Sequence, residues 1–135
     1  MNLITSLIVS ALATLCHTMY TEKQQKLLND IAEECAAKLD MELTYDYMQR
    51  FIYSGDLPDD AMSKKFIICT QKKIVEMDAD GKIQSQKIID NFADNHDIRA
   101  LTEVILKCSS VEGDTVEEKV YNFYKCLWIE KNFDL

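Results

Sequence analysis

Residues 27–39, LLNDIAEECAAKL, carry the pattern that decides the fold. Apolar side chains recur there at i, i+1, i+4 and i+5, at positions Leu27, Leu28, Ile31, Ala32, Cys35 and Leu39. This spacing gathers them on one face of an α-helix, because one turn takes about 3.6 residues. We therefore predict a first amphipathic helix over about residues 20–39, with a cysteine on its apolar face.

The same helical period continues along the rest of the chain, and only three glycines and one proline punctuate it. Thr44 can cap a second helix, which Gly55 ends, and Asp60 favours the start of a third. Turn and capping residues separate these from three further helices, centred near residues 89, 103 and 121. No stretch alternates apolar and polar residues as a strand does. The predicted fold class is all-α, a compact bundle of six helices.

Four cysteines lie on four of these predicted helices, at Cys35, Cys69, Cys108 and Cys126. An even set of cysteines in a small exported domain is typical of a disulfide framework, which adds stability where the core is modest. Four cysteines allow three pairings, and the helical period does not choose among them.

The N-terminal segment reads as an export signal. Residues 3–16, LITSLIVSALATLC, form a nearly continuous apolar run, and Glu22 begins a charged sequence. We predict a signal peptide over residues 1–19, cut somewhere between residues 15 and 21, and a helical domain over residues 20–135. A membrane anchor is the alternative, but the run is shorter than the roughly 20 residues of a spanning helix. The expected localisation is therefore secreted and extracellular, and the cut removes Cys16.

Charge and composition argue against several classes of function. The net charge of −8 disfavours nucleic acid and anionic membrane as partners. Asp78 and Asp80 resemble half of a calcium loop, but Lys87 stands where the bidentate glutamate belongs. His96 and Asp97 suggest a catalytic dyad, although Asp97 is better placed to cap a helix. We predict no enzymatic activity, no metal site and no cofactor.

The order and spacing of the cysteines resemble those of insect odorant-binding proteins. That family has a signal peptide, six helices and six cysteines, with three residues between the second and third cysteine and eight between the fifth and sixth. The first, third, fourth and sixth positions correspond here to Cys35, Cys69, Cys108 and Cys126. Further matches are residues 55–60 (GDLPDD), 77–83 (MDADGKI) and 124–126 (YKC).

The second and fifth cysteine positions are occupied by Lys65 and Glu117, a departure that resembles the four-cysteine Minus-C subclass. The resemblance implies the pairings Cys35–Cys69 and Cys108–Cys126, each worth roughly 3–4 kcal/mol in the chain-entropy model. The missing third bond predicts looser packing between the third and sixth helices. We expect Lys65 and Glu117 to face each other there in a weak surface ion pair.

The resemblance further implies a secreted carrier that reversibly binds and solubilises small hydrophobic molecules, such as odorants or pheromones, in an internal apolar cavity. Helix facing and family position suggest the wall residues Met48, Phe51, Ile74, Ile88, Ile89, Leu101, Val104, Ile105, Phe123 and Leu127. The alternative for each is ordinary core packing. The apolar C-terminal tail suggests a lid formed by Phe133 and Leu135, against the alternative of a frayed end.

The partner implied by the resemblance is a small hydrophobic ligand, with a membrane chemoreceptor as a further one and the chain acting as a monomer or weak homodimer. No stable membrane insertion is expected. A hydroxyl for a ligand carbonyl or alcohol could come from Tyr45, Tyr47, Tyr53, Tyr121 or Tyr124, but tyrosines at helix surfaces usually point their hydroxyls to water, and we expect that here. The competing hypothesis is a secreted helical interaction protein, a salivary, venom or signalling factor acting through its surface. Such a protein has a filled centre, whereas a carrier takes up a hydrophobic dye.

Overall fold

The structure, a computed structural model, describes residues 20–130, and every regular element in that range is a helix. The helices are α2 (Glu22–Lys38), α3 (Tyr45–Gln49) continuing into η1 (Arg50–Ser54), α4 (Ala61–Val75), α5 (Ser85–Phe92), α6 (Ile98–Cys108) and α7 (Val116–Glu130). The predicted all-α class is confirmed, although the first helix begins at Glu22 rather than near residue 20. The predicted signal peptide, residues 1–19, lies outside the described residues.

Side-chain caps set the helix boundaries. At the start of α2, the Thr21 hydroxyl accepts from the Gln24 backbone N–H, and the Gln24 side chain accepts from the Thr21 backbone N–H, which makes a capping box. Thr44 caps α3, Asp60 caps α4 and Asp97 caps α6, each through its side-chain oxygen. These short-range signals explain why the predicted second, third and fifth helices begin where they do.

The second helix departs from a regular α-helix. After Gln49 it continues as one π-helical turn, η1, closed by a 2.7 Å hydrogen bond from the Gly55 N–H to the Arg50 carbonyl. Gly55 then leaves the helix with φ of +64°, a left-handed conformation that glycine adopts without strain. The wider turn buries two consecutive side chains, Phe51 and Ile52, which are each only 5% exposed.

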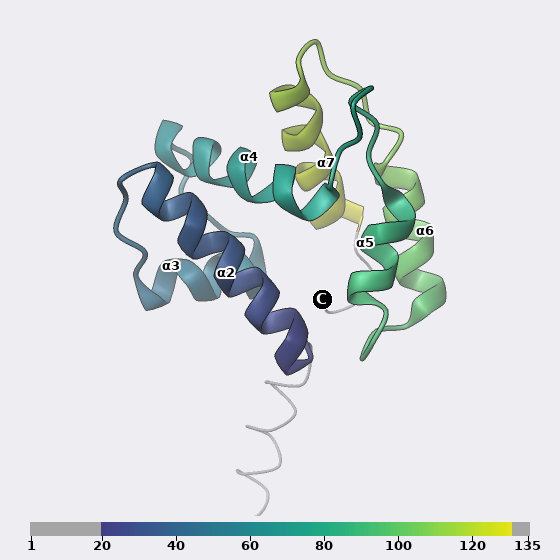
Figure 1. Cartoon of the computed structure of the whole chain (residues 1–135), viewed down its shortest axis with the longest axis horizontal. Coiled ribbons are helices and arrows are strands. Elements are labelled where there is room, and N and C mark those ends of the chain that lie inside the picture. Colours follow the sequence, from purple (N-terminus) through teal and green to yellow (C-terminus); the bar gives the residue numbers. More distant parts are fainter. Residues whose placement is uncertain (1–19, 131–135) are drawn as a thin grey trace, which may run out of the picture.

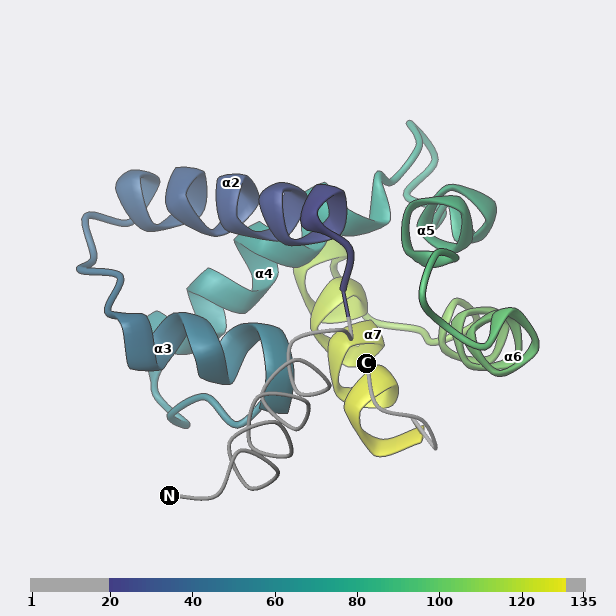
Figure 2. The ribbon, with the colours of Figure 1, turned by 90° about the horizontal axis from the view of Figure 1, so that it is seen from below.

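Helix α4 lies at the centre of the bundle and contacts α2, α5 and α7. In Figure 1, α2 and α3 lie on one side of it and the paired helices α5 and α6 lie on the other. Figure 2 shows α7 running between these two halves. Phe66, Val120 and Phe123 are completely buried where α4 and α7 pack together. No helix within residues 20–130 has the length and apolarity needed to cross a membrane.

Two disulfides join the helices in the pairing that the family resemblance implies. Cys35–Cys69 links α2 to α4 with a Cα–Cα distance of 5.8 Å, and Cys108–Cys126 links α6 to α7 with one of 5.5 Å. Both distances lie in the usual range. Cys35 and Cys108 are fully buried, so each bond is part of the core rather than a surface clasp.

The expected ion pair between Lys65 and Glu117 is wrong. Glu117 Oε1 instead accepts a 2.7 Å hydrogen bond from Lys72 Nζ. The reason is the antiparallel register of α4 and α7, in which Lys64 lies over the ring of Tyr121 while Lys72, two turns later, reaches Glu117. Both members of the pair are about half exposed, so it stabilises the contact only slightly. The two helices nevertheless pack directly on each other without a third disulfide.

Candidate functional site

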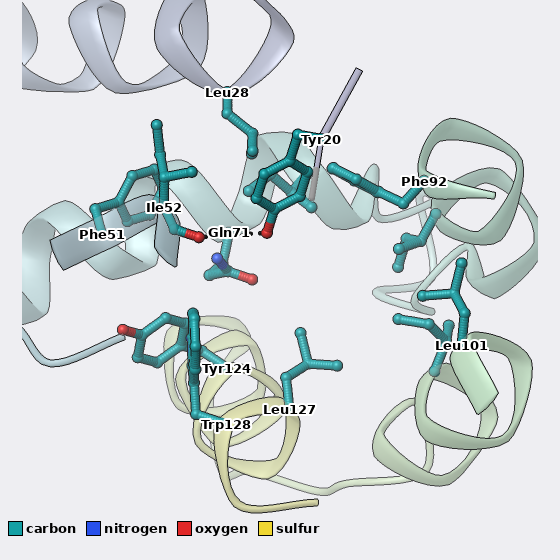
Figure 3. Close-up of a pocket in the computed structure, with 13 residues that line it drawn as sticks. Tyr20, Leu28, Phe51, Ile52, Gln71, Phe92, Leu101, Tyr124, Leu127 and Trp128 are labelled. Atoms are coloured by element: carbon teal, nitrogen blue, oxygen red, sulfur yellow. Dashed lines mark hydrogen bonds between the residues drawn. The ribbon is translucent and has the colours of Figure 1, made fainter. Parts of the chain in front are cut away.

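An apolar cavity lies where α2, η1, α4, α5, α6 and α7 converge (Figure 3). Its wall is formed by Tyr20, Leu28, Phe51, Ile52, Gln71, Ile74, Ile88, Phe92, Leu101, Ile105, Tyr124, Leu127 and Trp128. Its volume is about 80 Å³, below the ~300–1,000 Å³ of typical pockets for drug-sized ligands. A larger ligand therefore requires wall side chains to move.

The structure distributes the predicted wall residues between the cavity and the core. Those on the wall are Phe51, Ile74, Ile88, Leu101, Ile105 and Leu127. Those packed elsewhere in or against the core are Met48, Ile89, Val104 and Phe123. The predicted lid residues Phe133 and Leu135 lie outside the described residues. Ligand contact by any member of this set stays a prediction.

Seven residues of the wall were not predicted as wall residues: Tyr20, Leu28, Ile52, Gln71, Phe92, Tyr124 and Trp128. Helical periodicity places Leu28, Ile52 and Phe92 on apolar faces, so the same signal could have found them. Tyr20 precedes the first helix and has no such signal. Gln71 is polar, and an apolar pattern passes over it.

Two tyrosine hydroxyls near the cavity are used to hold the backbone of the second helix. The Tyr20 hydroxyl donates to the Ile52 carbonyl at 3.3 Å, and the Tyr124 hydroxyl donates to the Gly55 carbonyl at 3.1 Å. Tyr124 therefore does not point its hydroxyl to water as expected. Burial raises the pKa of both phenols, and the neighbouring Tyr53 and Tyr121 rings raise them further. Both groups are neutral donors at physiological pH.

These shifts predict a loss of stability in alkali. Above about pH 10 the unfolded tyrosines release protons while folded Tyr20 and Tyr124 retain theirs, so each lowers the free energy of unfolding by about 1.4 kcal/mol per pH unit. The stability that comes from the raised pKa values is fully present below about pH 10 and is lost as the pH rises toward the folded-state pKa. Urea titrations between pH 9 and 11.5 should show a shallower decline in Tyr20→Phe and in Tyr124→Phe. Tyr45→Phe, at a 78% exposed position, should leave the decline unchanged. Ordinary phenol ionisation of all tyrosines in the folded protein would contradict this prediction.

Gln71 brings an amide to the cavity. It lies on α4 two residues after Cys69, its side chain is 4% exposed, and its Oε1 has no hydrogen-bond partner among residues 20–130. Figure 3 shows this amide among the wall side chains, between Tyr20 and Ile52 on one side and Tyr124 and Leu127 on the other. A buried amide oxygen without a partner typically costs about 1–3 kcal/mol.

The other polar groups considered from the sequence have structural roles. Asp78 Oδ1 accepts from the backbone N–H groups of Lys82 and Asp80, at 2.8 and 2.9 Å, and organises the turn after α4. The Lys82 N–H hydrogen bond, above all, lowers the pKa of Asp78. Asp97 caps α6, as predicted. Within residues 20–130, no group of three or more His, Cys, Asp or Glu side chains is arranged to hold a metal ion.

A family model and a solved structure match this chain. The model of the PBP/GOBP family matches residues 17–130, a range that includes all six helices and both disulfides. Among solved structures, odorant-binding protein dmelOBP28a from Drosophila melanogaster is similar with a TM-score of 0.59 and 19% identity, over 78% of this chain and 90% of that one. At this identity the likeness shows the fold alone. No curated protein matches the chain. The chain belongs to the PBP/GOBP family, the insect odorant-binding proteins that its cysteine spacing resembles.

Proposed function

We propose that this protein is a secreted carrier that reversibly encloses a small hydrophobic molecule, such as an odorant or pheromone, in the cavity between its helices. The observation that carries the proposal is an apolar wall to which six helical segments contribute. Binding draws on burial of ligand apolar area, at about 25 cal/mol per Å², less the cost of immobilising the ligand. A protein that acts only through its surface does not require an internal apolar cavity.

Export and subclass belong to the same proposal. Tyr20 is buried against the rings of Tyr53 and Phe92, so a signal cut before Tyr20 keeps the cavity wall intact. The two disulfides, with Lys65 and Glu117 at the remaining cysteine positions, support the four-cysteine Minus-C subclass. Family likeness extends the proposal to a membrane chemoreceptor as partner, and to a chain acting as a monomer or weak homodimer.

Dye uptake tests the carrier function. N-phenyl-1-naphthylamine should bind with a Kd of about 1 μM, equivalent to about −8 kcal/mol. Binding should also quench Trp128, the sole tryptophan, because its indole is on the cavity wall. Small aliphatic alcohols should displace the dye.

A matched pair of variants on α6 locates the bound dye. Leu101→Phe adds volume at a wall position that is 1% exposed, and it should weaken dye binding about tenfold or more. Leu106→Phe adds the same volume at a position that is 56% exposed, and it should leave affinity unchanged. Absence of dye uptake, or equal affinity in both variants, would favour the secreted interaction protein instead.

A further inference from the structure

We propose that Gln71 selects the ligand by its polar group, and that the preferred ligand is a small apolar molecule carrying one hydroxyl that donates to Gln71 Oε1. This inference rests on the proposed carrier function and specifies the class of ligand. It comes from the unmet hydrogen-bonding capacity of one buried side chain.

Gln71 differs from the other three buried polar side chains in residues 20–130. The other buried polar atom without a partner there, His96 Nε2, belongs to a half-buried ring that is not on the cavity wall. Each of the other three has a hydrogen-bond partner within the protein. Gln24 Nε2 donates to the Asp94 carbonyl, the Thr70 hydroxyl donates to the Ile67 carbonyl, and Ser63 Oγ accepts from the Tyr47 hydroxyl. Within the described residues, Gln71 Oε1 has no partner although the side chain is only 4% exposed. Buried polar atoms in folded proteins are nearly always paired, so an exception on a cavity wall points to a partner from outside residues 20–130, and we assign that role to the ligand.

The surrounding hydroxyls do not meet this need. The Tyr20 and Tyr124 hydroxyls are on the same wall, but each already donates its single hydrogen to a backbone carbonyl. Apart from the indole of Trp128, the rest of the wall is hydrocarbon, including Ile74 one turn later on α4. Gln71 is therefore the one amide facing an apolar cavity, which is the arrangement of a site that orients an otherwise apolar ligand.

The type of polar group follows from the amide. An unpaired carbonyl oxygen requires a donor, and among small volatile molecules a hydroxyl supplies one. An ether, ester or aldehyde oxygen only accepts and leaves Gln71 Oε1 unpaired. The position is held firmly, because Cys69, two residues earlier, is bonded to Cys35.

A matched ligand pair tests this assignment. Hexan-1-ol and 1-methoxypentane have the same atoms and nearly the same length, but only the alcohol has an O–H donor. In displacement of N-phenyl-1-naphthylamine from the wild-type protein, the alcohol should bind about tenfold more tightly. Gln71→Met keeps the side-chain length and removes the amide, so the two ligands should then bind within about twofold of each other. Leu106→Phe, at a position that is 56% exposed and away from the cavity, should preserve the wild-type ratio.

Thermal unfolding without ligand separates recognition from a structural role. Gln71→Met should unfold at the same or a higher temperature than the wild type, because it removes an unpaired buried oxygen. A lower Tm would mean that Gln71 supports the fold, and equal affinity for alcohol and ether in the wild type would mean that it does not select a donor. Either result overturns the inference while leaving the carrier function intact. Failure of the dye to enter any variant would instead reject the carrier function.

Discussion

Replacing Cys35 and Cys69 together by alanine is expected to lower the free energy of unfolding by about 4 kcal/mol, and replacing Cys108 and Cys126 by about 3 kcal/mol. The difference follows from sequence separations of 34 and 18 residues, since the longer closed loop restricts the unfolded chain more. Removing both bonds should leave the domain largely unfolded at 37 °C, because losses of this size approach the whole stability of a small domain.

The two bonds hold different parts of the cavity wall. Cys35–Cys69 ties α2 to α4, which carry the wall residues Leu28 and Gln71. Cys108–Cys126 ties α6 to α7, which carry Leu101 and Leu127. Urea unfolding followed by circular dichroism measures the stability, and dye binding at low urea measures the cavity. Wild-type protein treated with a reducing agent is the control, and it should match the variant that lacks both bonds. Unchanged midpoints in both double variants would reject this account.

The number and class of the helices could be predicted because their determinants are local. The apolar period of residues 27–39 and the caps Thr44, Asp60 and Asp97 act within one or two turns, and the structure uses them all. The disulfide pairing was available only from the family resemblance, because the helical period allowed three pairings. The local pattern thus predicts where each helix begins and ends. The pairing of the cysteines depends on which helices pack together, which the local pattern does not show.

The ion pair of Glu117 illustrates this limit. The sequence shows that α4 offers two lysine pairs along its length, but the register of α4 against α7 decides that Lys72 rather than Lys65 reaches Glu117. That register depends on the packing of buried side chains such as Phe66 and Phe123, which no short-range pattern encodes.

The cavity wall could be predicted in part for the same reason. Periodicity identifies the apolar face of each helix, but a filled core and a hollow one show the same faces, so Ile88 lines the cavity while its neighbour Ile89 packs in the core. The π-helical turn also shifts the facing of Phe51 and Ile52 in a way that a regular helical period does not describe. Gln71 lies on the wall because of its position on α4. Since its side chain is polar, a search for apolar residues at helical spacing does not find it.

Gly55→Ala is the substitution with the largest effect expected from a single residue outside the disulfides. Gly55 has φ of +64°, where a side chain costs roughly 1–2 kcal/mol. Its Cα also lies against the indole of Trp128, and an added Cβ would overlap the ring atoms Cδ2, Cε2 and Cγ. Displacing a packed ring costs roughly another 1–3 kcal/mol. We expect the free energy of unfolding to fall by about 3 kcal/mol in total.

Gly81→Ala provides the matched control for this prediction. Gly81 also has positive φ, +76°, but an added Cβ there meets nothing within 4 Å, so only the backbone cost remains. The difference in the free energy of unfolding between the two variants therefore isolates the contact between Gly55 and Trp128.

The same contact affects both stability and binding. Trp128 lines the cavity, and the Gly55 carbonyl accepts from the hydroxyl of Tyr124, which lies on α7 with Trp128. Gly55→Ala should accordingly red-shift the Trp128 emission and weaken dye binding, while Gly81→Ala should do neither. Equal losses of stability in the two variants, with unchanged emission, would show that the indole does not depend on this turn for its place in the wall.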